Sequence, residues 1–247
     1  MKNTLAAIAS WVAGILAYGP ATAQSGNWNY EATIYLFAPE SKTAITTPAG
    51  RIEGTLSFGD AIENLDFAFM GAFAASNGKW SFLTDYMYTD MSFGNDAPGT
   101  SYSGLNTSMT TQILNGYAGY RVHDSGRAAV DLMAGFRWFD TDTTLTLQPG
   151  TAPQRSAAAN ASWVDPVIGF RIRAAFSDRW QGTAFFDYGG FSSGNETWQV
   201  LLTAGYALNE KWLLRGGYRY ISMENEVNGN PFEFSQSGAI FGATYRF

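Results

Sequence analysis

Apolar and polar side chains alternate with a period of two along most of the chain after residue 27. In residues 79–88, for example, one parity is aromatic and the other is polar. A period of two is the signature of a β-strand, whose successive side chains point to opposite faces. The pattern recurs in ten segments: residues 28–36, 65–73, 79–88, 107–122, 130–138, 164–176, 179–188, 198–208, 211–220 and 238–247. The sequence therefore predicts an all-β fold.

Charged residues gather on one parity of these segments, while the other parity is uncharged and rich in aromatic and small side chains. A soluble β-sandwich or lipocalin-like barrel, the alternative, would show Lys and Glu on its surface. Arg and Asp instead suit paired contacts in a confined interior, which favours a transmembrane barrel with a charged lumen and a lipid-facing apolar parity. The predicted lumen residues are Glu31, Asp66, Asp85, Asp131, Asp165, Asp187, Arg121, Arg137, Arg171, Arg173, Arg215, Arg219 and Arg246.

The predicted fold is a transmembrane antiparallel up-and-down β-barrel of about ten strands, with eight or twelve as alternatives. Residues 39–64 are interrupted by Pro39, Pro48 and Gly50. Residues 51–58 could form a strand and residues 59–64 a helical turn, but both 43–47 and 51–58 are short for a membrane-spanning strand of about nine residues or more. We therefore expect residues 39–64 to form a long loop or a segment in the lumen or mouth.

The amino-terminal segment has the pattern of a cleaved secretory signal peptide, residues 1–23. Lys2 precedes an uncharged, mostly apolar stretch from Leu5 to Tyr18, and Ala21-Thr22-Ala23 forms a small-x-small cleavage signal before Gln24. The alternative is a membrane anchor helix, for which this stretch is short. Residues 24–247 are then expected to form a single barrel domain.

Short connections rich in Asn, Asp, Ser and Gly alternate with longer ones. The short ones lie at residues 76–79, 123–127, 177–179 and 209–211, and the longer ones at 91–106, 141–162, 189–196 and 225–233. This asymmetry is typical of outer-membrane barrels with periplasmic turns and extracellular loops. A basic residue and then a tryptophan follow three of the short turns, so Trp80, Trp180 and Trp212 are predicted to anchor the barrel at the membrane interface.

The carboxy-terminal segment alternates and ends on an aromatic residue, with Phe241, Tyr245 and Phe247 on one parity. It resembles the terminal strand signal by which Gram-negative outer-membrane proteins are recognised for assembly. Residues 163–166, 187–191 and 217–220 resemble a widespread group of small, largely uncharacterised outer-membrane proteins of proteobacteria. The resemblance implies insertion by the barrel-assembly machinery and an outer-membrane location in contact with lipid and lipopolysaccharide. It implies location and fold far more than activity.

The sequence offers little for catalysis or metal binding. It contains no cysteine and a single histidine, His123, so a disulfide framework and a Cys- or His-built metal site are excluded. Barrel enzymes of the phospholipase, deacylase and omptin types need a histidine, and His123 lies in a turn expected to be periplasmic. We therefore expect no enzyme activity, no metal and no cofactor. A net charge of −6 argues against nucleic-acid binding.

A barrel of about eight strands is filled by its own side chains, whereas sixteen or more leave a channel. Ten strands favour a narrow or filled lumen and hence a structural or interaction barrel. A small-solute, porin-like pore with weak anion preference is the first alternative, and a lipid-modifying enzyme the second. Asp187 and Arg215 are candidate ion-pair partners because both lie on the predicted inner face. Neither a solute nor an oligomeric state follows from the sequence.

Overall fold

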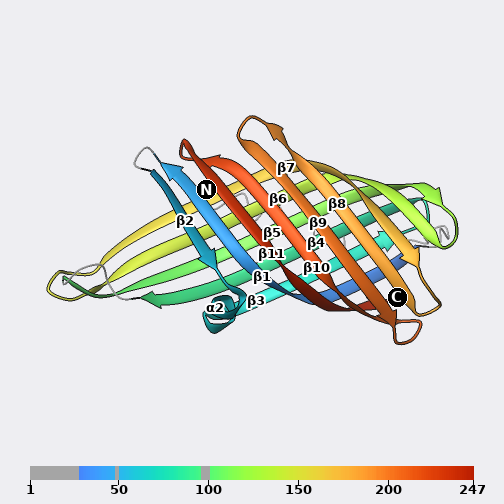
Figure 1. The fold of residues 1–247 in the computed structure, drawn as a ribbon, viewed down its shortest axis with the longest axis horizontal. Helices are drawn as coiled ribbons and strands as arrows, with labels where there is room; N and C mark the ends of the chain where they lie inside the picture. Colours follow the sequence, from blue (N-terminus) through green and yellow to red (C-terminus); the bar gives the residue numbers. More distant parts are fainter. Residues whose placement is uncertain (1–27, 48–49, 96–100) are drawn as a thin grey trace, which may run out of the picture.

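The computed structural model describes residues 28–47, 50–95 and 101–247, which form one antiparallel sheet (Figure 1). Its strands are β1 (Asn29–Thr47), β2 (Gly50–Leu56), β3 (Leu65–Ser76), β4 (Trp80–Asn95), β5 (Tyr102–Asp124), β6 (Ala128–Pro149), β7 (Arg155–Ala175), β8 (Trp180–Ser192), β9 (Asn195–Ala207), β10 (Trp212–Val227) and β11 (Asn230–Arg246). Strands β3 to β11 pair in chain order, and β11 pairs with β1 to close the ring. The expected up-and-down barrel is confirmed. The proposed signal peptide lies outside the described residues.

The ring is built from β1 and β3 to β11, as the ten-strand expectation required, and β2 is an addition to it. Along one edge of β1, residues 29–34 pair with β3 and residues 41–47 pair with β2. Helix α2 (Phe58–Glu63) joins β2 to β3, and the hydroxyl of Ser57 caps it by accepting a hydrogen bond from the Asp60 amide at 3.2 Å. The expectation of a long loop over residues 39–64 is therefore wrong, whereas the strand and the helical turn that the sequence allowed at 51–58 and 59–64 are present.

Both described ends of the chain lie at one end of the barrel together with the turns at residues 77–79, 125–127, 176–179 and 208–211, whereas the two-residue turns 193–194 and 228–229 lie at the other end. The Phe247 amide donates to the Tyr30 carbonyl oxygen at 3.0 Å, which closes β11 onto β1 there. We assign the end with the chain termini to the periplasm and the opposite end to the cell exterior, because β4 to β7 extend furthest at the opposite end and the extracellular segments of outer-membrane barrels are the longer ones. No helix in the described part of the chain is long and apolar enough to span a bilayer.

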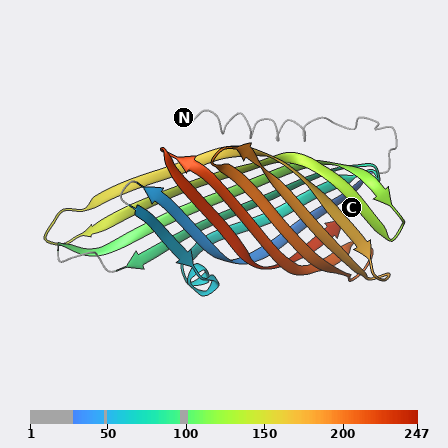
Figure 2. The same cartoon turned by 45° about the horizontal axis from the view of Figure 1, so that its top comes forward.

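Extended strands replace most of the expected extracellular loops. Strands β4 to β7 continue together far beyond β8 to β11 (Figure 2). Strand β4 still pairs with β5 at Asn95 and Leu105, and β6 with β7 at Leu147 and Arg155. Only residues 150–154 connect them, so the expected loop over 141–162 is wrong. The alternation of apolar and polar residues does not mark these strands, because Thr, Ser and Ala occupy both parities there. This is expected for a sheet exposed to solvent on both faces.

The apolar parity is the exposed outer surface of the barrel. Its large side chains include Ile34, Leu36, Phe67, Phe69, Phe73, Phe82, Leu132, Phe136, Ile168, Phe170, Ile172, Leu202, Leu214, Tyr218 and Phe241, each more than a third exposed. An apolar band of this extent is incompatible with water and marks a lipid-facing surface. The hydrophobic core of the protein lies inside the ring.

Candidate functional site

The middle of the lumen is crossed by a polar cluster centred on Arg137 of β6 and Asp187 of β8. One terminal nitrogen of Arg137 donates to both carboxylate oxygens of Asp187 at 2.8 Å. The other terminal nitrogen donates to the Thr197 hydroxyl at 2.6 Å, and the Nε donates to the Asn115 side-chain oxygen at 2.8 Å. The Tyr117 hydroxyl donates to Asp187 at 2.6 Å. Except for the bond between Arg137 and Asn115, which are register partners on β6 and β5, these bonds connect strands that are not neighbours in the sheet.

Arg219 of β10 and Asp85 of β4 extend this cluster across the remaining width of the lumen. A terminal nitrogen of Arg219 donates to Asp85 at 2.8 Å, and its Nε donates to the Gln199 side-chain oxygen at 2.8 Å. Tyr35 of β1 donates its hydroxyl to Asp85. The Gln199 amide donates to Asp187 at 2.9 Å, which joins the two halves. We call the whole set the polar ring: Tyr35, Asp85, Asn115, Tyr117, Arg137, Asp187, Thr197, Gln199 and Arg219.

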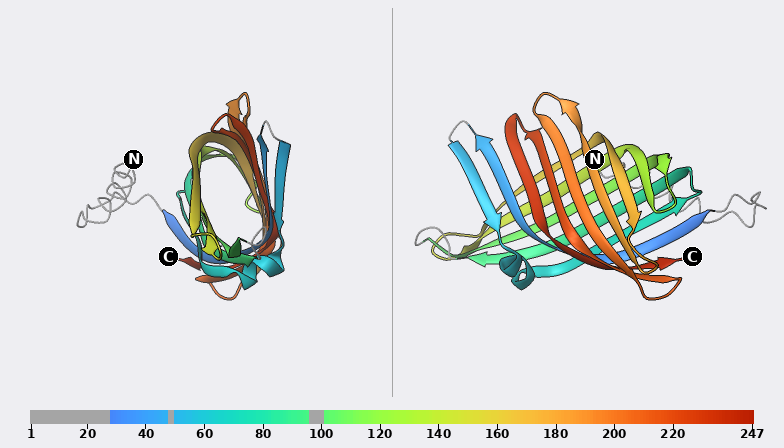
Figure 3. Two further views of the ribbon diagram at one scale, coloured as in Figure 1. Left: turned by 90° about the vertical axis from the view of Figure 1, so that its left-hand side faces the viewer. Right: turned by 45° about the vertical axis from the view of Figure 1, so that its right-hand side comes forward.

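The polar ring closes the lumen. The ribbon view along the barrel shows an oval ring of strands (Figure 3), but side chains fill the space inside it. Arg137, Asn115 and Asp187 have no exposed surface, and Arg219 is 1% exposed. Ionised groups hidden from water in this way require partners, and the ring supplies them within the chain.

An apolar layer lies directly above the polar ring on its extracellular side. One lumen-facing position further toward that end, Tyr35 is followed by Phe37, Asp85 by Met87, Asn115 by Ile113, Arg137 by Phe139 and Arg219 by Ile221. These apolar side chains pack into one buried cluster together with Met223 and Phe234. The guanidinium of Arg219 lies over the Phe37 ring at 5.8 Å, which links the two layers.

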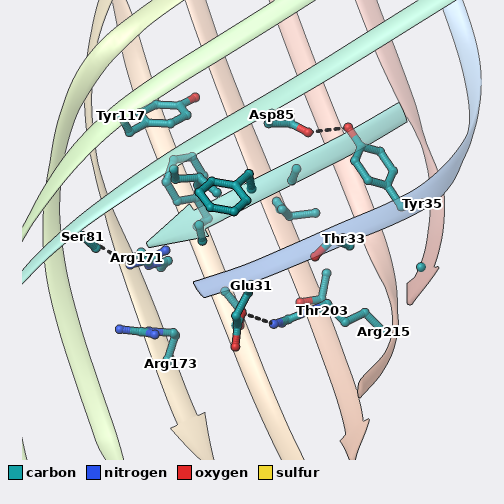
Figure 4. Close-up of a pocket in the computed structure, with 18 of the residues that line it drawn as sticks. Glu31, Thr33, Tyr35, Ser81, Asp85, Tyr117, Arg171, Arg173, Thr203 and Arg215 are labelled. Atoms are coloured by element: carbon teal, nitrogen blue, oxygen red, sulfur yellow. Dashed lines mark hydrogen bonds and ion pairs between the residues drawn. The ribbon is translucent and has the colours of Figure 1, made fainter. Parts of the chain in front are cut away.

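Below the polar ring, a cavity of about 190 Å³ extends to Asn29 and Ser76 at the periplasmic end. We call it the vestibule. Figure 4 shows Arg171, Arg173 and Arg215 pointing into it from β7 and β10. The polar ring forms its ceiling, because Tyr35, Asp85, Tyr117, Gln199 and Arg219 also line it.

The predicted charges of the periplasmic half form two groups. Asp131, whose side chain is 2% exposed, pairs with Arg121, with Arg171 at 2.8 Å and with Arg173 at 3.2 Å. Glu31 pairs with Arg215 and Arg246, both at 3.1 Å. The hypothesis that Asp187 pairs with Arg215 is therefore wrong, because Asp187 pairs with Arg137 across the lumen.

Two predicted lumen residues stand apart from these groups. Asp165 is fully buried and accepts a hydrogen bond from the Trp163 indole at 3.0 Å, and its other oxygen has no partner. Asp66 lies in a β-bulge at the start of β3, where it is exposed and outside both ion-pair groups. A bulge shifts the alternation by one residue, which is why parity alone misplaced Asp66.

Each predicted tryptophan anchor packs against a tyrosine on the neighbouring strand, directly opposite in register. The ring centroids are 5.0 Å apart in the pair of Trp80 with Tyr120 and 5.1 Å apart in the pair of Trp180 with Tyr206. They are 5.0 Å apart in the pair of Trp212 with Tyr245. These exposed pairs form an aromatic belt at the periplasmic edge of the apolar band, as expected for a membrane interface.

The remaining predicted residues lie on the surface. Phe241 and Phe247 of the predicted assembly signal are exposed on the outer face, and Tyr245 belongs to the aromatic belt. His123 is exposed at the periplasmic end of β5. Within residues 28–47, 50–95 and 101–247, no three His, Cys, Asp or Glu side chains are grouped to hold a metal ion.

Sequence reasoning from charge alone missed the uncharged members of the polar ring, Tyr35, Asn115, Tyr117, Thr197 and Gln199. Each shares its parity with the charges of its own or neighbouring strand, which is the one signal that could have found them. A hydroxyl or amide on the inner parity completes the hydrogen bonding of buried arginines and carboxylates.

Comparison with known proteins supports the fold. No protein-family model and no curated protein sequence matches the chain. The solved structure of the outer-membrane protease OmpT from Escherichia coli matches with a TM-score of 0.58 and 12% identity, covering 89% of this chain and 96% of that chain. The chain is an outer-membrane β-barrel. At this identity the likeness shows the fold alone.

Two further barrels are more distant. The translocator domain of the autotransporter NalP from Neisseria meningitidis has a TM-score of 0.41 and 13% identity, covering 99% of this chain and 98% of that chain. The attachment invasion locus protein Ail of Yersinia pestis has a TM-score of 0.39 and 7% identity, covering 89% of this chain and 98% of that chain.

Proposed function

We propose that this outer-membrane barrel is a non-conducting interaction protein. The observation that carries the proposal is the polar ring with its apolar layer, which together fill the lumen. A porin-like role needs a continuous aqueous path, and buried, mutually paired side chains occupy that path. The proposed role requires no catalytic chemistry.

The extracellular end supplies a surface suited to binding another polypeptide. Strand β8 leaves β7 at a bulge where Gly190 and Phe191 both adopt positive φ angles, 92° and 49°. In the described part of the chain, β7 pairs with β8 only from Val167 downward, so residues 155–165 pair with β6 alone. Such an edge presents backbone N–H and C=O groups that recognise an extended peptide segment.

The alternative is a small-solute pore, which the arginine-lined vestibule favours. Planar bilayer recording of the refolded protein distinguishes the two roles. A closed lumen predicts no steady single-channel current. A stable, ion-selective conductance at low voltage would instead establish the pore and overturn the proposal.

A second experiment tests the β7 edge. Because the sequence contains no native cysteine, only the introduced thiol can react with the crosslinker. Ala159→Cys places a thiol on the unpaired edge, and Thr144→Cys places one on β6, which pairs on both sides. With a thiol-reactive crosslinker on intact cells, we expect a polypeptide adduct from the β7 variant and not from the β6 control. Equal capture at both positions would contradict the assignment of the edge.

A further inference from the structure

The vestibule holds more positive than negative charge. The ion pairs in and beside it involve the five guanidinium groups of Arg121, Arg171, Arg173, Arg215 and Arg246, against the two carboxylates of Asp131 and Glu31. Of these residues, Arg171, Arg173, Arg215 and Glu31 line the cavity. Asp124, at the exposed rim, also pairs with Arg121. An excess of two positive charges therefore remains even when the rim is counted. The paired charges of the polar ring, Arg137 with Asp187 and Arg219 with Asp85, do not offset it.

Arg173 is the least compensated of these arginines. Its one ion pair, at 3.2 Å, is to Asp131, a carboxylate that also serves Arg121 and Arg171. The side chain of Arg173 is 36% exposed and lines the vestibule, and its Nε is buried without a hydrogen-bond partner. A buried N–H group of a cation without an acceptor is costly, so Arg173 is the arginine of this group whose hydrogen bonding is least complete.

Small side chains leave space beside Arg173. Across the sheet, Arg173 lies opposite Thr183, Thr183 opposite Thr203, and Thr203 opposite Gly217. Arg215 lies two residues from Gly217 on β10 and points into the same cavity (Figure 4). Thr183 and Thr203 both line the vestibule, and no described side chain bonds to their hydroxyl groups.

We propose that the vestibule binds a small oxyanion, of which orthophosphate is the representative, between Arg173 and Arg215 and against Thr183 and Thr203. Guanidinium groups match the oxygens of phosphate and carboxylate with paired N–H bonds, and hydroxyls add neutral donors. The cavity of about 190 Å³ is smaller than the pockets of drug-sized ligands, which suits a small ion. Its extent to the periplasmic end makes a free periplasmic anion the source. The site is independent of what the extracellular end binds.

Equilibrium dialysis of the refolded full chain with labelled inorganic phosphate tests the proposal. Chloride keeps the ionic strength constant, so general screening does not change during the titration. We expect saturable binding that Arg173→Gln weakens at least about tenfold, the scale of losing one charge-assisted hydrogen bond. Arg127→Gln is the matched control, because Arg127 is exposed at the β5–β6 turn and does not line the vestibule. It should bind as the wild type does.

A second variant keeps the proposal testable if Arg173→Gln fails to fold. Thr203→Glu would place a carboxylate where the anion is proposed to lie. It should raise the unfolding midpoint in phosphate-free buffer and abolish the further rise that phosphate gives the wild type. The proposal fails if the wild type shows no saturable binding, or if phosphate raises the midpoint of Thr203→Glu as much as that of the wild type. A conducting lumen in the bilayer experiment would leave these outcomes unchanged.

Discussion

Arg137 and Asp187 form a fully buried ion pair across the lumen, although β6 and β8 are separated in the sheet by β7. The 2.8 Å contacts to both carboxylate oxygens place the guanidinium of Arg137 at the centre of the polar ring. The stability of the barrel therefore depends on contacts between strands that are not hydrogen-bonded to each other.

Removing one member of this pair should cost more than removing both. Arg137→Met or Asp187→Leu alone leaves a buried charge without its partner, and we expect each to lower the unfolding free energy by about 3–5 kcal/mol. The double variant should lose less than either single variant. Urea unfolding in lipid vesicles measures all three. As a control, Asp187→Leu combined with Arg215→Met should be additive, because Arg215 bonds Glu31 and not Asp187. Additivity in the first cycle would refute the coupling.

The same substitution, to glutamate, made separately at two adjacent residues tests which face of the barrel each residue occupies. Leu202 is 52% exposed on the lipid face, midway between Trp198 and Tyr206 on β9, and its neighbour Thr203 faces the vestibule. Leu202→Glu should lower the unfolding free energy on the order of 2 kcal/mol. Thr203→Glu should be stabilising, because its carboxylate meets surplus arginines. Equal losses in vesicle unfolding experiments would contradict the face assignment.

The extracellular rim should make stability depend on pH through Glu224, which lies beyond the Trp198 and Tyr220 pair. Burial, and then the carboxylates of Glu233 and Glu196, raise the pKa of Glu224. A raised carboxyl pKa means that the folded state holds its proton more tightly than the unfolded state. The stability contributed by Glu224 is therefore present at low pH and lost as pH rises through the raised pKa.

Glu224→Gln removes this loss, so the variant should be more stable than the wild type near neutral pH and equal to it at acidic pH. Unfolding midpoints measured across this range provide the check. Glu210→Gln, in the exposed β9–β10 turn, is the control and should leave the profile unchanged. A variant profile parallel to that of the wild type would exclude Glu224 as the source.

Replacing the side chain of Phe247 distinguishes recognition of the chain during assembly from the stability of the folded barrel. The Phe247 ring is 70% exposed, and its backbone amide holds β11 to β1. Phe247→Ala keeps that amide, so the stability of the refolded barrel should change little. If the terminal aromatic belongs to the assembly signal, the amount of heat-modifiable barrel in cells should fall. Normal cellular yield of the variant would remove Phe247 from the signal.

The sequence alone determined the strands near the membrane and the face that each side chain occupies. Parity is a local property, because successive residues of a strand point to opposite sides wherever the strand lies. For this reason Phe82, Leu202 and Phe241 could be assigned to the lipid, and Arg137 and Asp187 to the lumen, without knowledge of their neighbours. Residues 141–149 escaped prediction because a strand wet on both faces has no parity to reveal it.

Only the tertiary structure decided which inner residues meet. Which inner side chains meet across a lumen depends on the number of strands, their tilt and their stagger. Local periodicity determines none of these quantities. Parity could therefore place Asp187 inside but could not choose between Arg215 and Arg137. The same geometry gathers the apolar inner residues above the polar ring and the surplus arginines below it. The closed lumen and the positive vestibule are properties of that arrangement, because both arise from strands that are distant in sequence.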